Sequence, residues 1–222
     1  MGFKLSFPEA ANHAATREHL LAAAGEVFAE VGFRAATVRQ ICQRADANIA
    51  AVNYHFGDKE ALYKAVLKQT CQSALEKYPA DFGLPSGATP EQRLRAFIHS
   101  FLLRIFSEGP SAQHGKLMVR EMIEPTGALD EIVEEDIRPM SVKLKAIVGD
   151  LLGRKANEET RRLCSMSVVS QVLFYHHCRP VVLRLFPNLK FNEAGIQQLT
   201  NHITRFSLAA IQEIARQPVK QK

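Results

Sequence analysis

Residues 37–59 read TVRQICQRADANIAAVNYHFGDK, and this stretch predicts two short helices joined by a tight turn. Thr37 and Gln40 form a capping box, the pattern that satisfies the free amides of a helix start. Apolar residues at one-turn spacing then give the first helix a single buried face, namely Val38, Ile41, Cys42 and Ala45. Because Asn48 can cap a second helix over residues 49–56, the stretch predicts a helix-turn-helix.

The second helix has the composition of a helix that must approach another molecule closely. Ala50, Ala51 and Asn53 leave little bulk on it, while Tyr54 and His55 add polar tips. A recognition helix that enters the major groove of DNA needs these properties. The sequence therefore predicts that this helix reads DNA.

Lys59 follows at the start of the next predicted helix. Gly57 can end the recognition helix in a left-handed conformation, and Asp58 can cap the helix after it. A cation in the first turn of a helix opposes the helix dipole, at a cost of about 0.3 to 1 kcal/mol, unless an anion is bound there. We therefore expect Lys59 and the neighbouring backbone amides to hold a DNA phosphate.

The motif VNYHFGDKEALY, residues 52–63, resembles the end of the DNA-binding domain of TetR-family transcriptional regulators. The resemblance covers residues 16–63 well and the rest of the chain in size and helix pattern. Its form VNYHF is similar to the subgroup that contains the cefoperazone and chloramphenicol sensitivity regulator. Five residues match the family pattern in type and position, namely Tyr54, His55, Phe56, Lys59 and Leu62. The resemblance implies an all-α fold, with an N-terminal three-helix helix-turn-helix domain and a C-terminal helical domain for ligand binding and dimerisation.

The candidate DNA-binding residues fall into two groups. The family pattern implies phosphate contacts by Thr37, Tyr54, His55 and Lys59. Candidates for contacts with base edges are Arg39, Asn48 and Asn53, since asparagine pairs with adenine and arginine with guanine. Each of these residues alone is typical of a helix cap or a surface side chain. Their combined spacing is what indicates DNA binding.

The bulk charge does not by itself explain DNA binding. The chain has a formal net charge of +5, but its first 60 residues hold six basic and seven acidic side chains. The excess of positive charge therefore lies in the remainder of the chain. The prediction of a DNA partner rests on the placement of Arg39, Arg44 and Lys59.

Composition predicts a soluble, cytoplasmic protein. The 222 residues are enough to bury a sizeable core, and 46% of them are hydrophobic. Widely spaced cysteines within apolar helical patterns predict reduced core thiols at Cys42, Cys71, Cys164 and Cys178. We find no signal segment and no apolar run long enough to cross a membrane, so no membrane partner is expected.

Helical patterns continue along the whole chain and suggest two domains. We assign residues 1–60 to the helix-turn-helix domain, with a loose arm at 1–15, a first helix over 16–31 and Gly32 as its end. The ligand-binding and dimerisation domain then covers 61–222. Its helices are expected from Asp58 to Tyr78, after Thr89-Pro90, from Gln113 to Glu124, from Leu129 to Leu151 with a kink at Pro139, from Leu163 to Phe186 with a bend at Arg179-Pro180, and from Asn192 to Arg216.

The last two helices are predicted to form a homodimer interface. Residues 163–186 are apolar or small on more than one face. The final helix has an apolar stripe and two apolar residues off it, the stripe being Ile196, Leu199, Ile203, Phe206, Ala210 and Ile214 and the others Leu208 and Ile211. Helices that are apolar beyond one stripe need a second partner. A two-fold dimer also suits a helix-turn-helix, because it presents two recognition helices to paired half-sites.

The resemblance further implies a small-molecule site between the fifth to eighth helices. An apolar wall for a lipophilic ligand is expected from Phe101, Ile105, Met118, Met122, Phe174 and Tyr175. Candidate polar contacts are Arg104, Glu121 and His177. A Met and Phe stripe at helical spacing is equally typical of an ordinary core. The polar groups are equally typical of pairs between helices, so both interpretations stay open.

No metal, cofactor or catalytic group is expected. His176-His177-Cys178 suggests a metal site with His99 or His114, but adjacent helical residues point about 100 degrees apart and cannot all bind one ion. Paired carboxylates, a phosphate loop and a nucleophile elbow are all missing from the sequence, so we predict no enzyme. A metal-binding or enzymatic helical protein using the His176 region, or an adaptor whose N-terminal head binds protein, remain the alternatives.

These observations together predict a homodimeric transcriptional regulator that binds a palindromic operator. Regulators of the TetR type are most often repressors, so a repressor is expected. Partners are double-stranded operator DNA and a small-molecule inducer. Ligand binding in the C-terminal domain is expected to release the DNA, which requires that the ligand bind the two states unequally.

Overall fold

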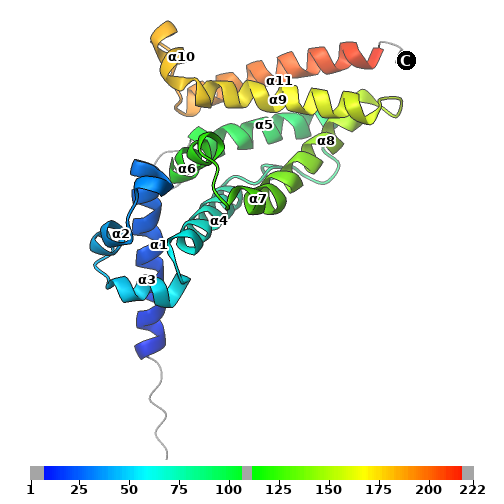
Figure 1. Ribbon diagram of the computed structural model, residues 1–222. Helices are drawn as coiled ribbons and strands as arrows, with labels where there is room; N and C mark the ends of the chain where they lie inside the picture. The colour runs from blue at the N-terminus through cyan, green and yellow to red at the C-terminus, as the bar shows by residue number, and fades with distance from the viewer. Residues whose placement is uncertain (1–7, 107–111, 217–222) are drawn as a thin grey trace, which may run out of the picture. The chain divides into compact units, whose positions relative to one another are not determined.

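The computed structural model describes residues 8–106 and 112–216, and these residues form α-helices and connecting loops without a strand (Figure 1). This arrangement confirms the predicted all-α fold. The chain forms two compact units: residues up to Gln72 with Gln113–Ile132, and Ser73–Ala112 with the residues from Val133 on. Within the described ranges, no helix has an apolar run that could cross a lipid bilayer.

The first unit is built from α1 (Pro8–Ala35), α2 (Val38–Arg44), α3 (Ile49–Phe56), most of α4 (Lys59–Lys77), α6 (Ala112–Ile123) and α7 (Leu129–Ile132). Its core gathers apolar residues that recur at about one-turn spacing along the helices, including Leu20, Ala24, Val27, Phe28, Ile41, Leu62 and Val66. Apolar side chains spaced one turn apart bury one face of each helix, which brings α1, α2 and α3 together.

The beginning and end of α1 differ from the sequence prediction. Residues 8–15, predicted as an arm, are helical, and residues 1–7 of that arm lie outside the described residues. Gly32 does not end the helix but interrupts it with a φ of 81°, and a further turn continues to Ala35. Val31, the residue before the interruption, is exposed.

Arg120 of α6 explains why a glycine stands at this interruption. Its Nε donates to the carbonyl oxygen of Ala29 at 3.2 Å and its Nη2 to that of Glu30 at 2.7 Å. A Cβ on Gly32 would lie 2.9 Å from Arg120 Nη1. The position therefore requires glycine both for its positive φ and for the close approach of the guanidinium group.

Glu121, the next residue of α6, is completely buried in the same unit, with 0% of its surface exposed. Its carboxylate accepts hydrogen bonds from the Tyr63 hydroxyl at 2.9 Å, from Thr126 N at 2.8 Å and from Thr126 Oγ1 at 3.0 Å. Burial, together with the hydrogen bond to Glu121, raises the pKa of Tyr63 well above its usual value, so this hydroxyl stays a donor. The three bonds attach α6 and the loop after it to α4.

The second unit contains α5 (Pro90–Phe106), α8 (Arg138–Leu152), α9 (Glu158–His177), α10 (Arg179–Leu185) and α11 (Glu193–Arg216). The predicted start of α5 is confirmed by a reciprocal cap, in which Gln92 N donates to Thr89 Oγ1 and Thr89 N donates to Gln92 Oε1. Its stripe forms much of the core, through Leu94, Phe97, Ile98, Leu102 and Ile105. Figure 1 shows α9 and α11 side by side, with α10 at one end of this pair.

The chain around Pro139 forms a π-helical turn, Val133–Ile137, between α7 and α8. Proline has no N–H for the carbonyl four residues earlier, and its ring clashes with that carbonyl. A turn with i→i+5 bonding widens the helix just before the proline and avoids the clash. The predicted kink is thus observed as a change of helix type, while the predicted split at Pro180 is observed as the break between α9 and α10.

The apolar stripe predicted for α11 is buried along only part of its length. Its residues Ile196, Leu199 and Ile203 are buried, whereas Phe206, with 61% of its surface exposed, and Ala210 are exposed, and Ile211, which lies off the stripe, is buried. The true buried face runs through Ile196, Thr200, Ile203, Ser207 and Ile211. Polar residues can lie on it because they are hydrogen-bonded: Thr200 Oγ1 donates to Ile196 O, and Ser207 Oγ accepts from Gln171 Nε2.

His176 lies against an aromatic group at the end of α9. Its ring is 5.3 Å from that of Phe106 in an edge-to-face arrangement, and Phe106 stacks on Phe191 at 4.4 Å. Burial, with smaller contributions from the charges of His177 and Arg179, lowers the pKa of His176 to about 4. The fold therefore favours the neutral imidazole.

This depressed pKa predicts acid sensitivity of the second unit. His176 contributes stability in full above pH 6.5, its ordinary pKa, and this contribution is lost as the pH falls from 6.5 to about 4, because only the unfolded chain takes up the proton. The free energy of unfolding of the unchanged protein should fall between pH 7 and pH 5 as His176 loses its contribution. In His176→Phe this fall should be smaller by about 2 kcal/mol, as measured by urea unfolding at the two pH values. His202→Phe, at an exposed position of α11, is the control. Equal pH dependence of the His176 variant and the unchanged protein would contradict the assignment.

Candidate DNA-binding site

The start of α2 holds Thr37 as predicted. Its Oγ1 accepts from Gln40 N at 3.2 Å, and Thr37 N donates to Gln40 Oε1 at 2.9 Å, so the capping box is complete. Arg39, the second residue of the helix, is exposed. The cap fixes the direction in which α2 begins, and Thr37 and Arg39 lie on the solvent side of it.

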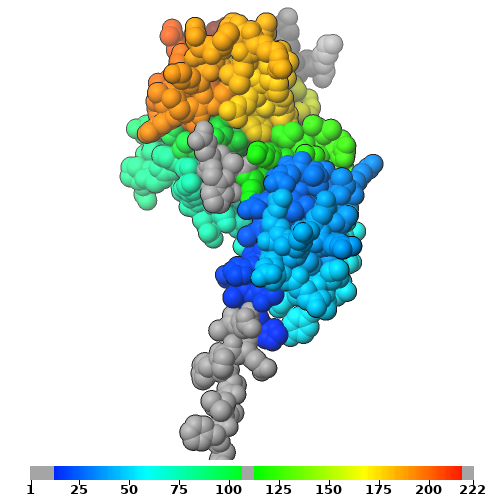
Figure 2. Space-filling model, turned by 90° about the vertical axis from the view of Figure 1, so that its left-hand side faces the viewer, coloured from blue at the N-terminus to red at the C-terminus, as the bar shows by residue number. Residues whose placement is uncertain are grey.

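The predicted recognition helix, α3, is anchored by few side chains. Asn48 caps it, since its Oδ1 accepts from Ala50 N at 2.9 Å, and Val52 is its fully buried residue. Asn53 is exposed, and Tyr54 has 73% of its surface exposed. Figure 2 shows atoms of α2 and α3, in light blue, on an open part of the surface of the first unit. The helix is therefore held by its cap, by Val52 and by the half-buried Ala51, His55 and Phe56, while Ile49, Ala50, Asn53 and Tyr54 are exposed.

Aromatic rings gather at the end of α3 and beside the first turns of α1. The ring of Tyr54 lies 4.9 Å from that of His55, and His13 lies 5.6 Å from Tyr54 and 6.1 Å from His55. One turn after His13, the guanidinium of Arg17 stands 5.3 Å from the ring of Phe56. The structure thus groups the rings of Tyr54, His55 and His13.

His13 was missed from the sequence because residues 1–15 were assigned to an arm. Pro8 followed by Glu9 could have corrected this, since proline at the first helical position and an acidic residue in the first turn both indicate a helix start. With α1 beginning at Pro8, His13 lies on a helix that contacts α3.

Lys59 has a second role that its sequence position did not reveal. Its Nζ donates to Phe33 O at 3.0 Å and to Ala36 O at 2.9 Å, and it lies 4.5 Å from the centre of the Phe33 ring. These carbonyl groups belong to the last turn of α1 and to the residue before Thr37. Two of the three N–H donors of Lys59 are therefore used inside the unit, and one remains for an outside acceptor.

Arg44 is not available for DNA in the way the sequence suggested. Its guanidinium forms two hydrogen bonds with Glu30, at 2.9 and 3.0 Å, and lies 3.7 Å from Glu26. The hydrogen bond from Arg44 also lowers the pKa of Glu30. This pair connects α2 to α1, so Arg39 is the arginine of α2 that stays available to an outside acceptor.

The predicted ligand-site residues are divided between the two compact units. Met118, Glu121 and Met122 belong to the first unit, where Glu121 is fully hydrogen-bonded and Met118 Sδ lies 4.0 Å from Cys71 Sγ. The second unit holds the others, namely Phe101, Arg104, Ile105, Phe174, Tyr175 and His177. Within it the buried Arg104 guanidinium lies 5.4 Å from the Phe101 ring, while Phe174 and His177 are exposed.

The His176-His177-Cys178 segment does not form a cluster of metal ligands. The His176 ring packs on Phe106, and Cys178 is a free, half-buried thiol at the end of α9. Among the residues that the structure describes, no three His, Cys, Asp or Glu side chains are grouped so that they could hold a metal ion.

A capped helix pair with an exposed second helix, followed by a larger helical unit, defines a helix-turn-helix transcriptional regulator. Residues 20–66 match the family model "Bacterial regulatory proteins, tetR family", and residues 90–211 match the model "HTH-type transcriptional dual regulator CecR, C-terminal domain". The chain belongs to the TetR family of regulators, in the group with a CecR-type C-terminal domain. The predicted family and subgroup are confirmed.

Similar proteins extend over most of the chain. It is 26% identical over 197 residues to the HTH-type transcriptional dual regulator CecR of Shigella flexneri, which covers 85% of this chain and 87% of that protein. A TetR-family regulator from Streptomyces coelicolor has the same fold, with a TM-score of 0.65 at 15% identity over 90% of this chain and 97% of that one. AibR, solved with isovaleryl coenzyme A and operator DNA, has a TM-score of 0.65 at 15% identity over 86% and 97%. The family and these relatives are transcriptional regulators and not enzymes, which leaves the enzymatic alternative without support.

Proposed function

We propose that this chain is a cytoplasmic, ligand-responsive repressor that binds a palindromic operator as a homodimer. The observation that carries the proposal is the exposed helix α3, held at its start by Asn48 and carrying Asn53, Tyr54 and His55 on its accessible surface. A helix fixed in this way can enter a major groove without unfolding its support.

The proposed DNA contacts keep the two groups deduced from the sequence. Phosphates are bound by Thr37, Tyr54, His55 and the free donor of Lys59, and base edges are read by Arg39, Asn48 and Asn53. The side-chain amide of Asn48 supports this assignment, because its oxygen is used in the cap and its NH₂ group is left for an acceptor on a base. Phosphate contacts set the position of the protein, and base contacts set its specificity.

The proposed homodimer uses α9 and α11. Large apolar side chains are exposed on these helices, namely Leu163, Met166 and Phe174 of α9 and Phe206 and Ile214 of α11. Such residues cost free energy in water and are expected to pack against the same residues of a second subunit around a two-fold axis. Two subunits would then present two α3 helices to half-sites about one DNA turn apart.

A small lipophilic inducer is proposed for the domain formed by residues 61–222, with residues 1–60 as the DNA-binding domain. Ile105 is buried in the core of the second unit and Phe101 and Tyr175 pack against that core, which supports an apolar ligand, whereas Phe174 is exposed. AibR is a relative in fold whose structure holds isovaleryl coenzyme A together with operator DNA. α4 runs without interruption from Lys59 in the first unit to Lys77 in the second unit. A 100-fold loss of operator affinity needs a coupling free energy of ~2.7 kcal/mol.

The test starts from an operator selected out of random double-stranded oligonucleotides by the full-length protein. Tyr54→Ala is then expected to weaken binding to this operator by about tenfold or more, because it removes a phosphate contact and the ring that supports His55. Affinity is measured by fluorescence anisotropy at several salt concentrations. Ile123→Ala is the matched control, since Ile123 is also 73% exposed and lies in the same unit, but on α6. Failure to enrich any DNA sequence, or equal affinities of the Tyr54 variant and the unchanged protein, would overturn the proposal.

A further inference from the structure

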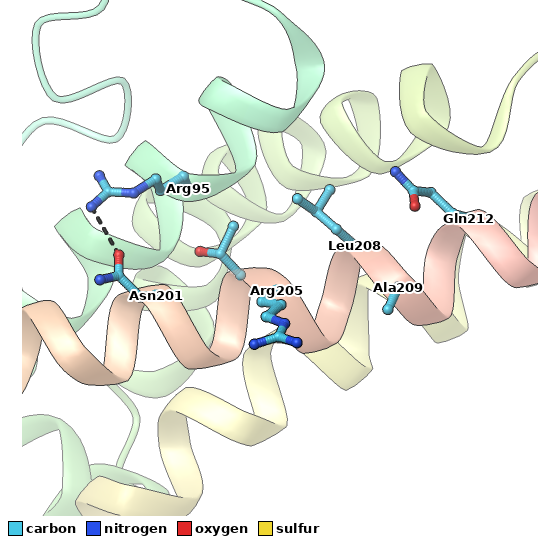
Figure 3. A pocket seen from close by; sticks show the side chains of 7 residues that line it. Arg95, Asn201, Arg205, Leu208, Ala209 and Gln212 are labelled. Atoms are coloured by element: carbon cyan, nitrogen blue, oxygen red, sulfur yellow. Dashed lines mark hydrogen bonds between the residues drawn. The ribbon is translucent and has the colours of Figure 1, made fainter.

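A groove runs along α11 in the second unit and is bordered by Arg95 of α5 (Figure 3). It has a volume of about 480 Å³ and is lined by Arg95, Asn201, Thr204, Arg205, Leu208, Ala209 and Gln212. The groove shares α11 with the proposed homodimer interface. None of the residues proposed above for DNA or for the inducer, and none of the exposed apolar side chains proposed for the dimer, belongs to its lining.

The hydroxyl of Thr204 is the least expected element of the groove. Only 7% of Thr204 is exposed, and its Oγ1 has no hydrogen-bond partner among the residues that the structure describes. Other hydroxyls within these helices donate to a carbonyl of the preceding turn, as Thr200 does to Ile196 O at 2.8 Å and Ser165 to Arg161 O at 2.7 Å. A buried hydroxyl without a partner is unfavourable by about 1 to 3 kcal/mol. Thr204 thus presents an unsatisfied donor in the wall of the groove.

The remaining polar groups of the lining are mainly donors. Asn201 Oδ1 already accepts from Arg95 Nη2 at 3.1 Å and from Gln197 Nε2 at 3.0 Å, so its NH₂ group is the part left to bind another molecule. Figure 3 shows Arg95 held toward Asn201, while Arg205 extends away from α5. Arg205 forms no ion pair with any residue in the described parts of the chain, and none of the seven lining residues is acidic. The groove is cationic and rich in donors.

An apolar strip completes the lining. Leu208 and Ala209 follow Thr204 and Arg205 by one helical turn, so they continue the same face of α11. Donors at one part of a groove and apolar side chains at the next fit a ligand with an anionic head and a hydrocarbon chain.

We propose that this groove binds a small amphipathic anion, a carboxylate or a phosphate ester with a short hydrocarbon chain. The anion receives hydrogen bonds from Thr204 Oγ1, the Asn201 amide and Arg95, with Arg205 as the second positive charge, and the chain lies on Leu208 and Ala209. The inference is independent of DNA binding, because no residue of the first unit takes part in it.

The test measures binding of hexanoate and of hexyl phosphate to the full-length protein by isothermal titration calorimetry, with hexanol as the neutral probe of equal chain length. The two anions distinguish a carboxylate site from a phosphate site. We expect at least one anion to bind tenfold or more tightly than hexanol, and its affinity to fall about tenfold in Arg205→Gln and severalfold in Thr204→Val. Arg184→Gln, at an exposed position of α10, is the control and should not change the affinity.

Several results would overturn the proposal. These are hexanol binding as well as the anions, no binding of either anion, or affinities that are unchanged in the Arg205 and Thr204 variants. Circular dichroism and urea unfolding of each variant exclude loss of the fold as the cause of lost binding. Sedimentation gives a separate result: if Arg205→Gln dissociates the subunits and neither anion binds, the groove is a subunit contact and the proposal is wrong.

Discussion

Replacing Glu121 with alanine is expected to lower the free energy of unfolding by about 3 to 5 kcal/mol, the largest effect of any single substitution considered for the first unit. The carboxylate has no exposed surface and accepts three hydrogen bonds, from the Tyr63 hydroxyl and from Thr126 N and Oγ1. Alanine leaves these buried donors without an acceptor and opens a cavity between α6 and α4. Urea unfolding followed by far-ultraviolet circular dichroism measures the change.

Milder variants separate the parts of this network. Tyr63→Phe removes a single donor and is expected to cost about 1 kcal/mol, while Glu121→Gln keeps one oxygen acceptor and should fall between the two. The sequence suggested Glu121 as a polar contact for a ligand. That role would instead make Glu121→Ala lose inducer affinity at unchanged stability, so a stability loss below about 1 kcal/mol would contradict the structural assignment.

Replacing Lys59 with alanine is expected to weaken operator binding and to destabilise the DNA-binding unit at the same time. Loss of one phosphate contact lowers the salt slope of binding by about 0.9. Loss of the hydrogen bonds from Nζ to Phe33 O and Ala36 O lowers the unfolding free energy by about 1.5 to 3 kcal/mol, since these bonds come from a charged group. Anisotropy titrations in graded salt and urea unfolding measure the two effects independently.

Comparison with two variants assigns each effect to its cause. Lys59→Met keeps an unbranched side chain but has no charge and no donors. Its salt slope should fall as in Lys59→Ala, and the hydrogen bonds to Phe33 O and Ala36 O should be lost. Lys64→Ala, in the next turn of α4, breaks an ion pair with Glu60 at 3.4 Å and serves as the control, with little effect on either measurement. An unchanged salt slope in Lys59→Ala would show that the lysine acts only inside the unit, and unchanged stability would show the reverse.

The caps were predictable from the sequence because they are local. Thr37 with Gln40, Asn48 with Ala50, and Asn192 with Gly195 are separated by two or three residues, and each pair is observed as a hydrogen bond. The chemistry of such a pair depends on its own turn of the chain and little on what packs around it. The position of the recognition helix followed from these caps.

The partners of charged side chains were not predictable in the same way. Lys59 bonds to carbonyl groups 23 and 26 residues earlier, and Glu121 to a tyrosine 58 residues away. Helical spacing tells which side chains share a face, but it does not tell what that face meets. For the same reason Phe206 shares the predicted apolar stripe of α11 with the buried Ile196 and Ile203 but is itself exposed.

The ligand-site prediction also relied on helical spacing, which does not tell what an apolar face packs against. A run of Met and Phe residues at helical spacing indicates only that a face is apolar. The structure places Met118 beside Cys71 within the first unit and leaves Phe174 on the surface of the second. Residues that were grouped by their chemistry are thus distributed by the packing of helices that are distant in sequence.

The backbone crosses between the two compact units more than once, so the DNA-binding unit is not one continuous segment of the chain. The chain passes from one unit to the other after Gln72, after Ala112 and after Ile132, and the first of these passages lies inside the continuous helix α4. Recombination that joined the first 60 residues to a foreign C-terminal half would separate Arg120 from the carbonyl groups of Ala29 and Glu30 to which it donates. We therefore expect the helix-turn-helix domain and α6 to be exchanged together in recombination. A chimera built from this chain should include α6 along with the first 60 residues.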